Sequence, residues 1–130
     1  MRVFNELKGE MIMAMLDVKN SIDRLQWTVD HHFLHIQAQH DFMRAWAVQF
    51  ELAYTDFRVI QMALQMSGPE NHALLAKLAK NYEAIFQYEY EFAANGLAGF
   101  NAKYGDQIDQ YKTLVTEFDG IIKEVQALQA

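Results

Sequence analysis

The sequence predicts an all-α protein, an up-down four-helix bundle with a long central helix. Apolar residues recur at alternating steps of three and four along most of the chain, which is typical of helices that bury one face. One proline and six glycines interrupt 130 residues, and 52% of the residues are hydrophobic. This size and composition predict one domain over residues 1–130.

A first helix is predicted over about residues 3–27, where the apolar spacing continues from Phe4 to Leu25. We place its end near Thr28, because a threonine hydroxyl can cap the next helix. The spacing nevertheless continues through Thr28 without losing phase. The alternative is therefore a very long first helix followed by a helical hairpin, which would require an intertwined dimer.

The central helix is predicted over residues 30–66, a stretch with neither glycine nor proline and with few charges. Two neighbouring sets of apolar residues give it a broader apolar surface than a helix with one buried face needs. Because this helix would extend roughly 55 Å, it would overhang the other helices. Both features predict self-association.

Two further helices are predicted over about residues 69–95 and 102–129. Ser67, Gly68 and Pro69 form a stop, since glycine suits a helix C-terminus and proline suits the first turn of the next helix. Asn95 and Gly96 mark the following connection.

The net charge of −6 and the scattered basic residues argue against nucleic-acid binding and against membrane-surface binding. No apolar run reaches the length of a membrane span, and no secretion signal is recognisable, so a cytoplasmic location is expected. The chain contains no cysteine, which excludes disulfides and thiol chemistry. Gly-rich phosphate loops and serine nucleophile elbows are also absent from the sequence.

Four of the five histidines lie within ten residues of one another. His31 and His35 are four apart, so their rings project from one helix face and can chelate a transition metal. Two ligands do not complete a metal site. The alternative interpretation is that the two histidines face solvent or a protein partner. No cofactor is expected, with a transition metal as the alternative.

Three polar residues are predicted on buried seams: His32, His40 and Glu89. A buried carboxylate needs a partner, because an unpaired buried charge is very costly. The candidate partners of Glu89 are His32, His40, Arg44 and a tyrosine hydroxyl. Such a network would fix the register of the helices, or would form a small-ligand site between them.

These observations predict a non-enzymatic acidic bundle that acts through protein contacts, as an adaptor, a chaperone-like protein or an inhibitor, and no catalytic residue is assigned. A protein partner and a homo-oligomer, such as a homodimer, are expected. The predicted interface residues are Met11, Met13, Phe42, Trp46 and Met62. The alternative is a sensor that binds a metal or small ligand through the stretch from His31 to His40 and Glu89.

Overall fold

The computed structural model describes residues 18–128, which form helices and no strand. The long helices are α2 (Lys19–Gln37), α3 (Ala47–Met66), α4 (His72–Tyr104) and α5 (Ile108–Ala127). Short 3₁₀ helices precede the last three of these: Arg44–Trp46, Pro69–Asn71 and Gly105–Gln107. The predicted all-α fold class is confirmed. Among the described residues, no helix combines the length and apolar character needed to cross a membrane.

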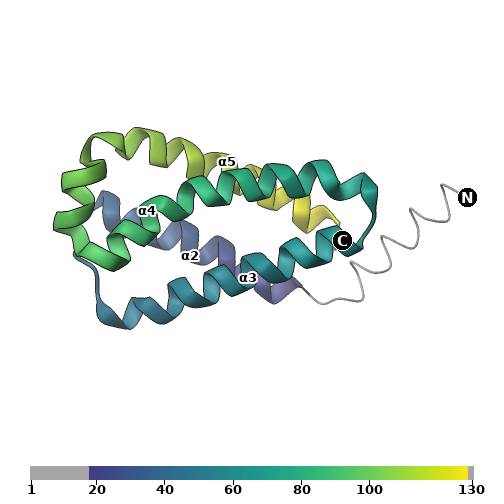
Figure 1. Ribbon diagram of the computed structural model, residues 1–130, viewed down its shortest axis with the longest axis horizontal. Coiled ribbons are helices and arrows are strands. Elements are labelled where there is room, and N and C mark those ends of the chain that lie inside the picture. Colours follow the sequence, from purple (N-terminus) through teal and green to yellow (C-terminus); the bar gives the residue numbers. More distant parts are fainter. Residues whose placement is uncertain (1–17, 129–130) are drawn as a thin grey trace, which may run out of the picture.

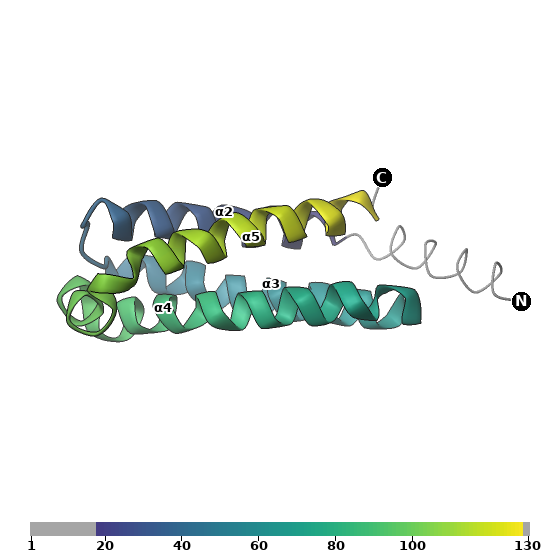
Figure 2. The ribbon, with the colours of Figure 1, turned by 90° about the horizontal axis from the view of Figure 1, so that it is seen from above.

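The four long helices run antiparallel to their neighbours in the chain (Figure 1). They form two layers, with α2 beside α5 in one layer and α3 beside α4 in the other (Figure 2). Each helix contacts the next one along the chain, and α5 closes the bundle against α2. This is the up-down arrangement that the apolar spacing predicts.

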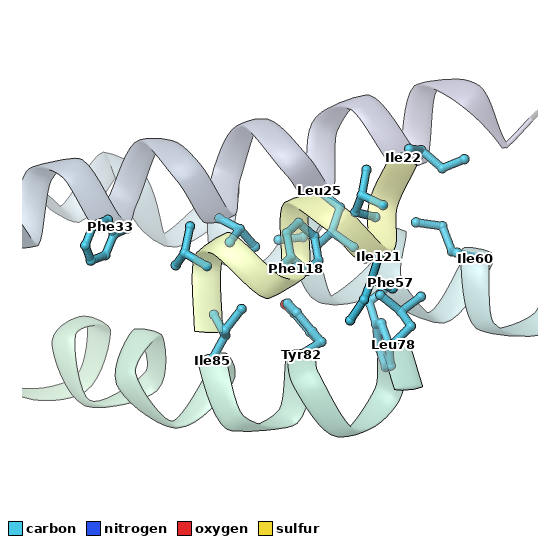
Figure 3. Packing of buried hydrophobic residues seen from close by; sticks show 14 of the residues in the cluster. Ile22, Leu25, Phe33, Phe57, Ile60, Leu78, Tyr82, Ile85, Phe118 and Ile121 are labelled. Carbon is cyan, nitrogen blue, oxygen red and sulfur yellow. The ribbon is translucent and has the colours of Figure 1, made fainter. Parts of the chain in front are cut away.

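The core lies along the centre of this bundle and receives side chains from all four helices (Figure 3). On α2 and α5 the buried residues recur at steps of three and four, which places them on one face of each helix. The larger side chains that are almost wholly buried include Leu25, Ile60, Tyr82, Phe92 and Phe118. Burial of such side chains is the main force that stabilises the fold.

The predicted central helix over residues 30–66 is wrong. α2 continues through Thr28, which is buried inside it, and ends at Gln37. Gln39 then has a φ of 63°, which ends the helical path, and α3 begins only at Ala47. The predicted boundary near Thr28 and the alternative of one very long first helix are therefore also wrong. Residues 3–17 of the predicted first helix lie outside the described residues.

Asp41 stabilises this break through a contact that is distant in the sequence. Its Oδ1 accepts hydrogen bonds from the backbone N–H of Phe42 at 2.8 Å and of Leu97 at 2.9 Å. These two N–H groups lower the pKa of the Asp41 carboxyl. The connection between α2 and α3 is thereby held against α4.

A two-point ion pair joins α2 to α3. The Arg24 guanidinium donates to both carboxylate oxygens of Asp56, from Nε at 3.1 Å and from Nη2 at 2.8 Å. Asp56 is buried, so this pairing supplies the partner that a buried carboxylate requires.

The outer face of α3 remains apolar. Exposed on it are Val48, Leu52, Val59, Met62 and Met66. The excess of apolar residues between positions 30 and 66 is thus divided between two helices, and part of it stays on the surface of the described bundle.

α3 ends at Met66, directly before the predicted stop, and Gly68 has a φ of 123°. The predicted connection at Asn95 and Gly96 is present, because Gly96 has non-helical backbone angles (φ 71°, ψ −172°) that divide α4 there. A second helical segment follows this kink and continues to Tyr104. The segment after the kink crosses the end of the bundle toward α5 (Figure 1).

We expect Gly96→Ala to destabilise the protein by about 1–2 kcal/mol, since a side chain is strained at positive φ. The added Cβ would also lie 3.2 Å from Asp41 Oδ1. Gly120→Ala is the matched control, because Gly120 is exposed in α5 with nothing within 4 Å of the new Cβ. There, alanine should stabilise the helix by about 0.5–1 kcal/mol. Denaturant unfolding measures the stability of both variants. A Gly96→Ala variant as stable as the wild type would show that a side chain at position 96 is not strained.

Candidate functional site

A groove of about 400 Å³ runs between α3 and α4, and we call it the α3–α4 groove. Each helix contributes four residues at the spacing i, i+3, i+4 and i+7, which places each set on one helix face. The lining residues are Ala47, Phe50, Glu51 and Tyr54 from α3, and Phe86, Glu89, Tyr90 and Ala93 from α4. Its volume lies within the usual range of small-ligand sites.

Aromatic rings form much of the wall of this groove. The ring centres of Tyr54 and Phe86 lie 5.7 Å apart, and those of Phe86 and Tyr90 lie 6.1 Å apart. Tyr54 and Tyr90 are 46% and 61% exposed, so ring faces and hydroxyl groups are accessible. Small alanines at two lining positions leave room beside the rings. Such a wall can bind the apolar face of a ring-shaped ligand and donate hydrogen bonds at its rim.

Glu89 brings a buried carboxyl group to the groove. Its side chain belongs to the lining, yet the residue is only 1% exposed. Neither carboxyl oxygen has a hydrogen-bond partner among the described residues. Burial raises the pKa of Glu89 to about 8, because the charged form loses its hydration. At neutral pH this group is therefore a carboxylic acid with a proton to donate.

Two tyrosine hydroxyls share this interior with Glu89. The hydroxyls of Tyr82 and Tyr111 also have no hydrogen-bond partner among the described residues. Burial raises the pKa of both phenols, and the negative charge of Glu89 raises them further. The predicted hydrogen-bond partners of Glu89 are thus wrong for residues 18–128, because the core around it offers no charge or donor at bonding distance.

Glu51 supplies a second carboxylate to the same groove. It is exposed and lies on α3, one helical turn before Tyr54. Sequence reasoning missed Glu51, because the predicted rod gave no reason to place this helix face opposite Glu89. The available signal was the spacing i, i+3, i+4 and i+7, which both helices share. When α3 and α4 are antiparallel neighbours, this spacing places Glu51 and Tyr54 in the same groove as Phe86 and Glu89.

The two carboxyl groups differ in burial, since Glu89 is buried and Glu51 is exposed. A buried carboxyl with a raised pKa acts as a proton donor at neutral pH, while a solvated carboxylate acts as a base or nucleophile. The α3–α4 groove therefore combines a buried carboxyl with a raised pKa, an exposed glutamate and an aromatic wall.

A larger pocket of about 550 Å³ lies between α4 and α5. Its charged lining residues, Lys77, Lys80, Glu117 and Glu124, are exposed. Lys77 and Glu124 pair with each other at 2.7 Å. Since the lining includes no buried titratable group, this pocket lacks the acid that distinguishes the α3–α4 groove.

His32 is fully buried, but it is not brought into contact with Glu89. Its Nε2–H donates to Gln49 Oε1 at 2.7 Å, and its Nδ1 has no partner among the described residues. Burial lowers the pKa of His32 to about 4, and the neighbouring His31 and His35 lower it as well. His32 is therefore neutral at physiological pH.

The buried position predicted for His40 is wrong. Because α2 ends at Gln37, His40 lies on the exposed connection after the helix. It joins the predicted metal pair instead, with its Nδ1 2.9 Å from Nδ1 of His35. The Nε2 atoms of His31 and His35 are also 2.9 Å apart. Over residues 18–128, no group of three or more His, Cys, Asp or Glu side chains is placed to hold a metal ion.

Three of the predicted interface residues lie in the part of the chain that the structure describes. Phe42 and Trp46 are partly buried against the core, whereas Met62 is 58% exposed on α3. Met11 and Met13 lie outside the described residues. Self-association stays a prediction.

Comparison with known families identifies the chain more specifically. Residues 7–124 match the family model described as the glycosyl hydrolase family 92 catalytic domain. No curated protein and no solved structure matches the chain. The family match overturns the prediction of a non-enzymatic protein that acts through protein contacts. Since the match extends over most of the chain, this protein belongs to the family of the glycosyl hydrolase family 92 catalytic domain.

Proposed function

We propose that the chain hydrolyses glycosidic bonds in the α3–α4 groove, with Glu89 as the general acid. The buried, unpartnered carboxyl of Glu89 carries this proposal, because its pKa of about 8 keeps it protonated at neutral pH. Glycoside hydrolysis commonly uses one carboxylic acid to protonate the leaving oxygen and a second carboxylate on the other side of the bond. Membership of a glycosyl hydrolase family supports the same chemistry.

In the proposed reaction, Glu89 transfers its proton to the glycosidic oxygen as the bond from that oxygen to the anomeric carbon breaks. Glu51 either removes a proton from the attacking water or attacks the anomeric carbon itself. On the first route, water supplies the new hydroxyl group of the sugar, Glu51 passes the proton it removed to solvent, and Glu89 regains a proton from solvent. On the second route, water breaks the bond between Glu51 and the anomeric carbon while Glu89 takes a proton from that water. The anomeric configuration of the first product, followed by NMR, distinguishes the two routes.

The aromatic wall supports a carbohydrate substrate. Sugar rings present apolar C–H faces that pack on aromatic rings, while their hydroxyls bond to groups at the rim. The rings of Tyr54 and Tyr90 both lie near that of Phe86, and all three line the same groove as Glu89.

We expect the full chain to release 4-nitrophenol from at least one member of a panel of 4-nitrophenyl glycosides that differ in sugar and anomeric configuration. The double variant Glu51→Gln/Glu89→Gln, prepared in parallel, is the control for contaminating hydrolases. On an alkyl glycoside of the same sugar, the rate of the wild type should fall as pH rises through about 8, as Glu89 loses its proton. Equal rates for wild type and double variant on every glycoside would contradict the proposal.

A further inference from the structure

A chain of three histidine rings joins the end of α2 to the connection that follows it. His31 Nε2 lies 2.9 Å from His35 Nε2, and His35 Nδ1 lies 2.9 Å from His40 Nδ1. His31 and His35 are partly exposed and His40 is exposed, so solvent ions can reach these nitrogen atoms. None of the three lines the α3–α4 groove.

We propose that His31 and His35 form a chelate site for a transition-metal ion such as Cu²⁺, and that His40 orients His35 within it. This inference goes beyond the proposed hydrolysis and does not depend on it.

The two Nε2 atoms share a hydrogen bond at 2.9 Å, so one metal ion that displaces the shared proton can bind both nitrogens. Metal–imidazole bonds are about 2.0–2.1 Å long. Two such bonds at a right angle place their nitrogen atoms about 2.9 Å apart, whereas a tetrahedral angle places them about 3.3 Å apart. Because the observed 2.9 Å is the length of a hydrogen bond, it does not select one of these geometries. Cu²⁺ is the ion of choice because it binds imidazole nitrogens more tightly than Ni²⁺ or Zn²⁺ do. With only two protein ligands, water would fill the remaining positions.

His40 would fix the tautomer that the metal requires. A His35 ring that binds metal through Nε2 carries its proton on Nδ1. That Nδ1–H can donate to His40 Nδ1, which lies 2.9 Å away. Such a bond to the outer nitrogen of a metal-binding histidine holds the ring in place and raises its basicity. His40 is thus a positioning residue and not a ligand.

Two tryptophans hold the ligand rings from the side. Trp27 stacks on His31 with ring centres 4.2 Å apart and an interplanar angle of 15°. Trp46 lies against His35 with ring centres 4.3 Å apart. These contacts restrict the two rings before any metal arrives, which lowers the entropy lost on binding. Since the chain has two tryptophans, its whole tryptophan fluorescence reports on this site.

The test titrates Cu²⁺ into the full chain without a polyhistidine tag, and follows tryptophan fluorescence and electron paramagnetic resonance. We expect saturable quenching with one Cu²⁺ per chain and a spectrum with two imidazole nitrogens bound to copper. His31→Ala and His35→Ala should each weaken binding at least tenfold, because the chelate is lost. His40→Ala should weaken it about tenfold while the two-nitrogen spectrum remains.

His72→Ala is the matched control, because His72 is an exposed histidine at the start of α4, apart from the three-ring chain. It should bind Cu²⁺ as the wild type does. Far-UV circular dichroism checks that α2 is intact in every variant. Unchanged affinity in the double variant His31→Ala/His35→Ala, or a wild-type spectrum with fewer than two imidazole nitrogens, would overturn the chelate. Unchanged affinity in His40→Ala would overturn the positioning role.

Discussion

Glu89→Gln is expected to lower kcat/KM for an alkyl glycoside by about 10²–10⁴-fold, the usual contribution of a general acid. Glutamine has nearly the same shape and cannot donate the catalytic proton. The loss should be much smaller for a 4-nitrophenyl glycoside, because nitrophenolate leaves without protonation. Steady-state rates on the two substrates measure the difference, which a purely structural role of Glu89 would not produce.

Glu83→Gln is the control for this experiment, since Glu83 is an exposed glutamate of α4 that does not line the groove. It should leave both rates unchanged. Equal losses on the two substrates in Glu89→Gln would contradict the role of Glu89 as proton donor.

The same Glu89→Gln substitution is expected to stabilise the fold at neutral pH, by about 3 kcal/mol at pH 7. The unfolded chain ionises this carboxyl near 4.5, whereas the folded chain keeps it protonated up to about 8. Between these values the folded state binds more protons than the unfolded state. The free energy of unfolding of the wild type must therefore decrease as pH rises from about 4.5 to about 8.

Urea unfolding at several pH values tests this expectation. The gain from Glu89→Gln should be small at pH 4 and should increase as pH rises toward 8. Asp30 contributes a decrease of the same sign in both proteins, because burial and Asp119 raise its pKa to about 7. The difference between the two proteins isolates Glu89. A constant difference across this range would show that Glu89 has an ordinary pKa in the folded chain.

The fold class and most helix faces could be predicted from the sequence, because apolar spacing reports which side of a helix is buried. On α5, for example, the apolar residues Tyr111, Phe118 and Val125 follow one another at steps of seven and are all buried. The stop at Ser67, Gly68 and Pro69 could also be predicted, since these residue types favour a turn for local reasons.

The break after α2 could not be predicted in the same way. It contains no glycine or proline, and one of its stabilising contacts, from Leu97 N–H to Asp41, spans 56 positions in the sequence. Missing this break also hid the candidate site. A single helix from Asp30 to Met66 does not predict that Glu51 lies in the same groove as Glu89. It also places His40 on a buried helix face.

The position of Glu89 on the apolar seam predicts that its carboxyl is buried. It does not predict that the carboxyl lacks hydrogen-bond partners among the described residues. A seam predicts burial and says nothing about which donors from other helices come within reach. In the fold, the hydroxyls of Tyr82 and Tyr111 share the interior with Glu89 without bonding to it. The raised pKa is therefore a property of tertiary structure.

The proposed hydrolysis requires Glu89 to be a neutral acid in the folded protein at physiological pH. A ¹³C NMR titration of glutamate side-chain carboxyls, with the Glu89 signal assigned by its loss in Glu89→Gln, measures this directly. We predict a midpoint at about 8. A midpoint near 4.5, the ordinary value for glutamate, would contradict it.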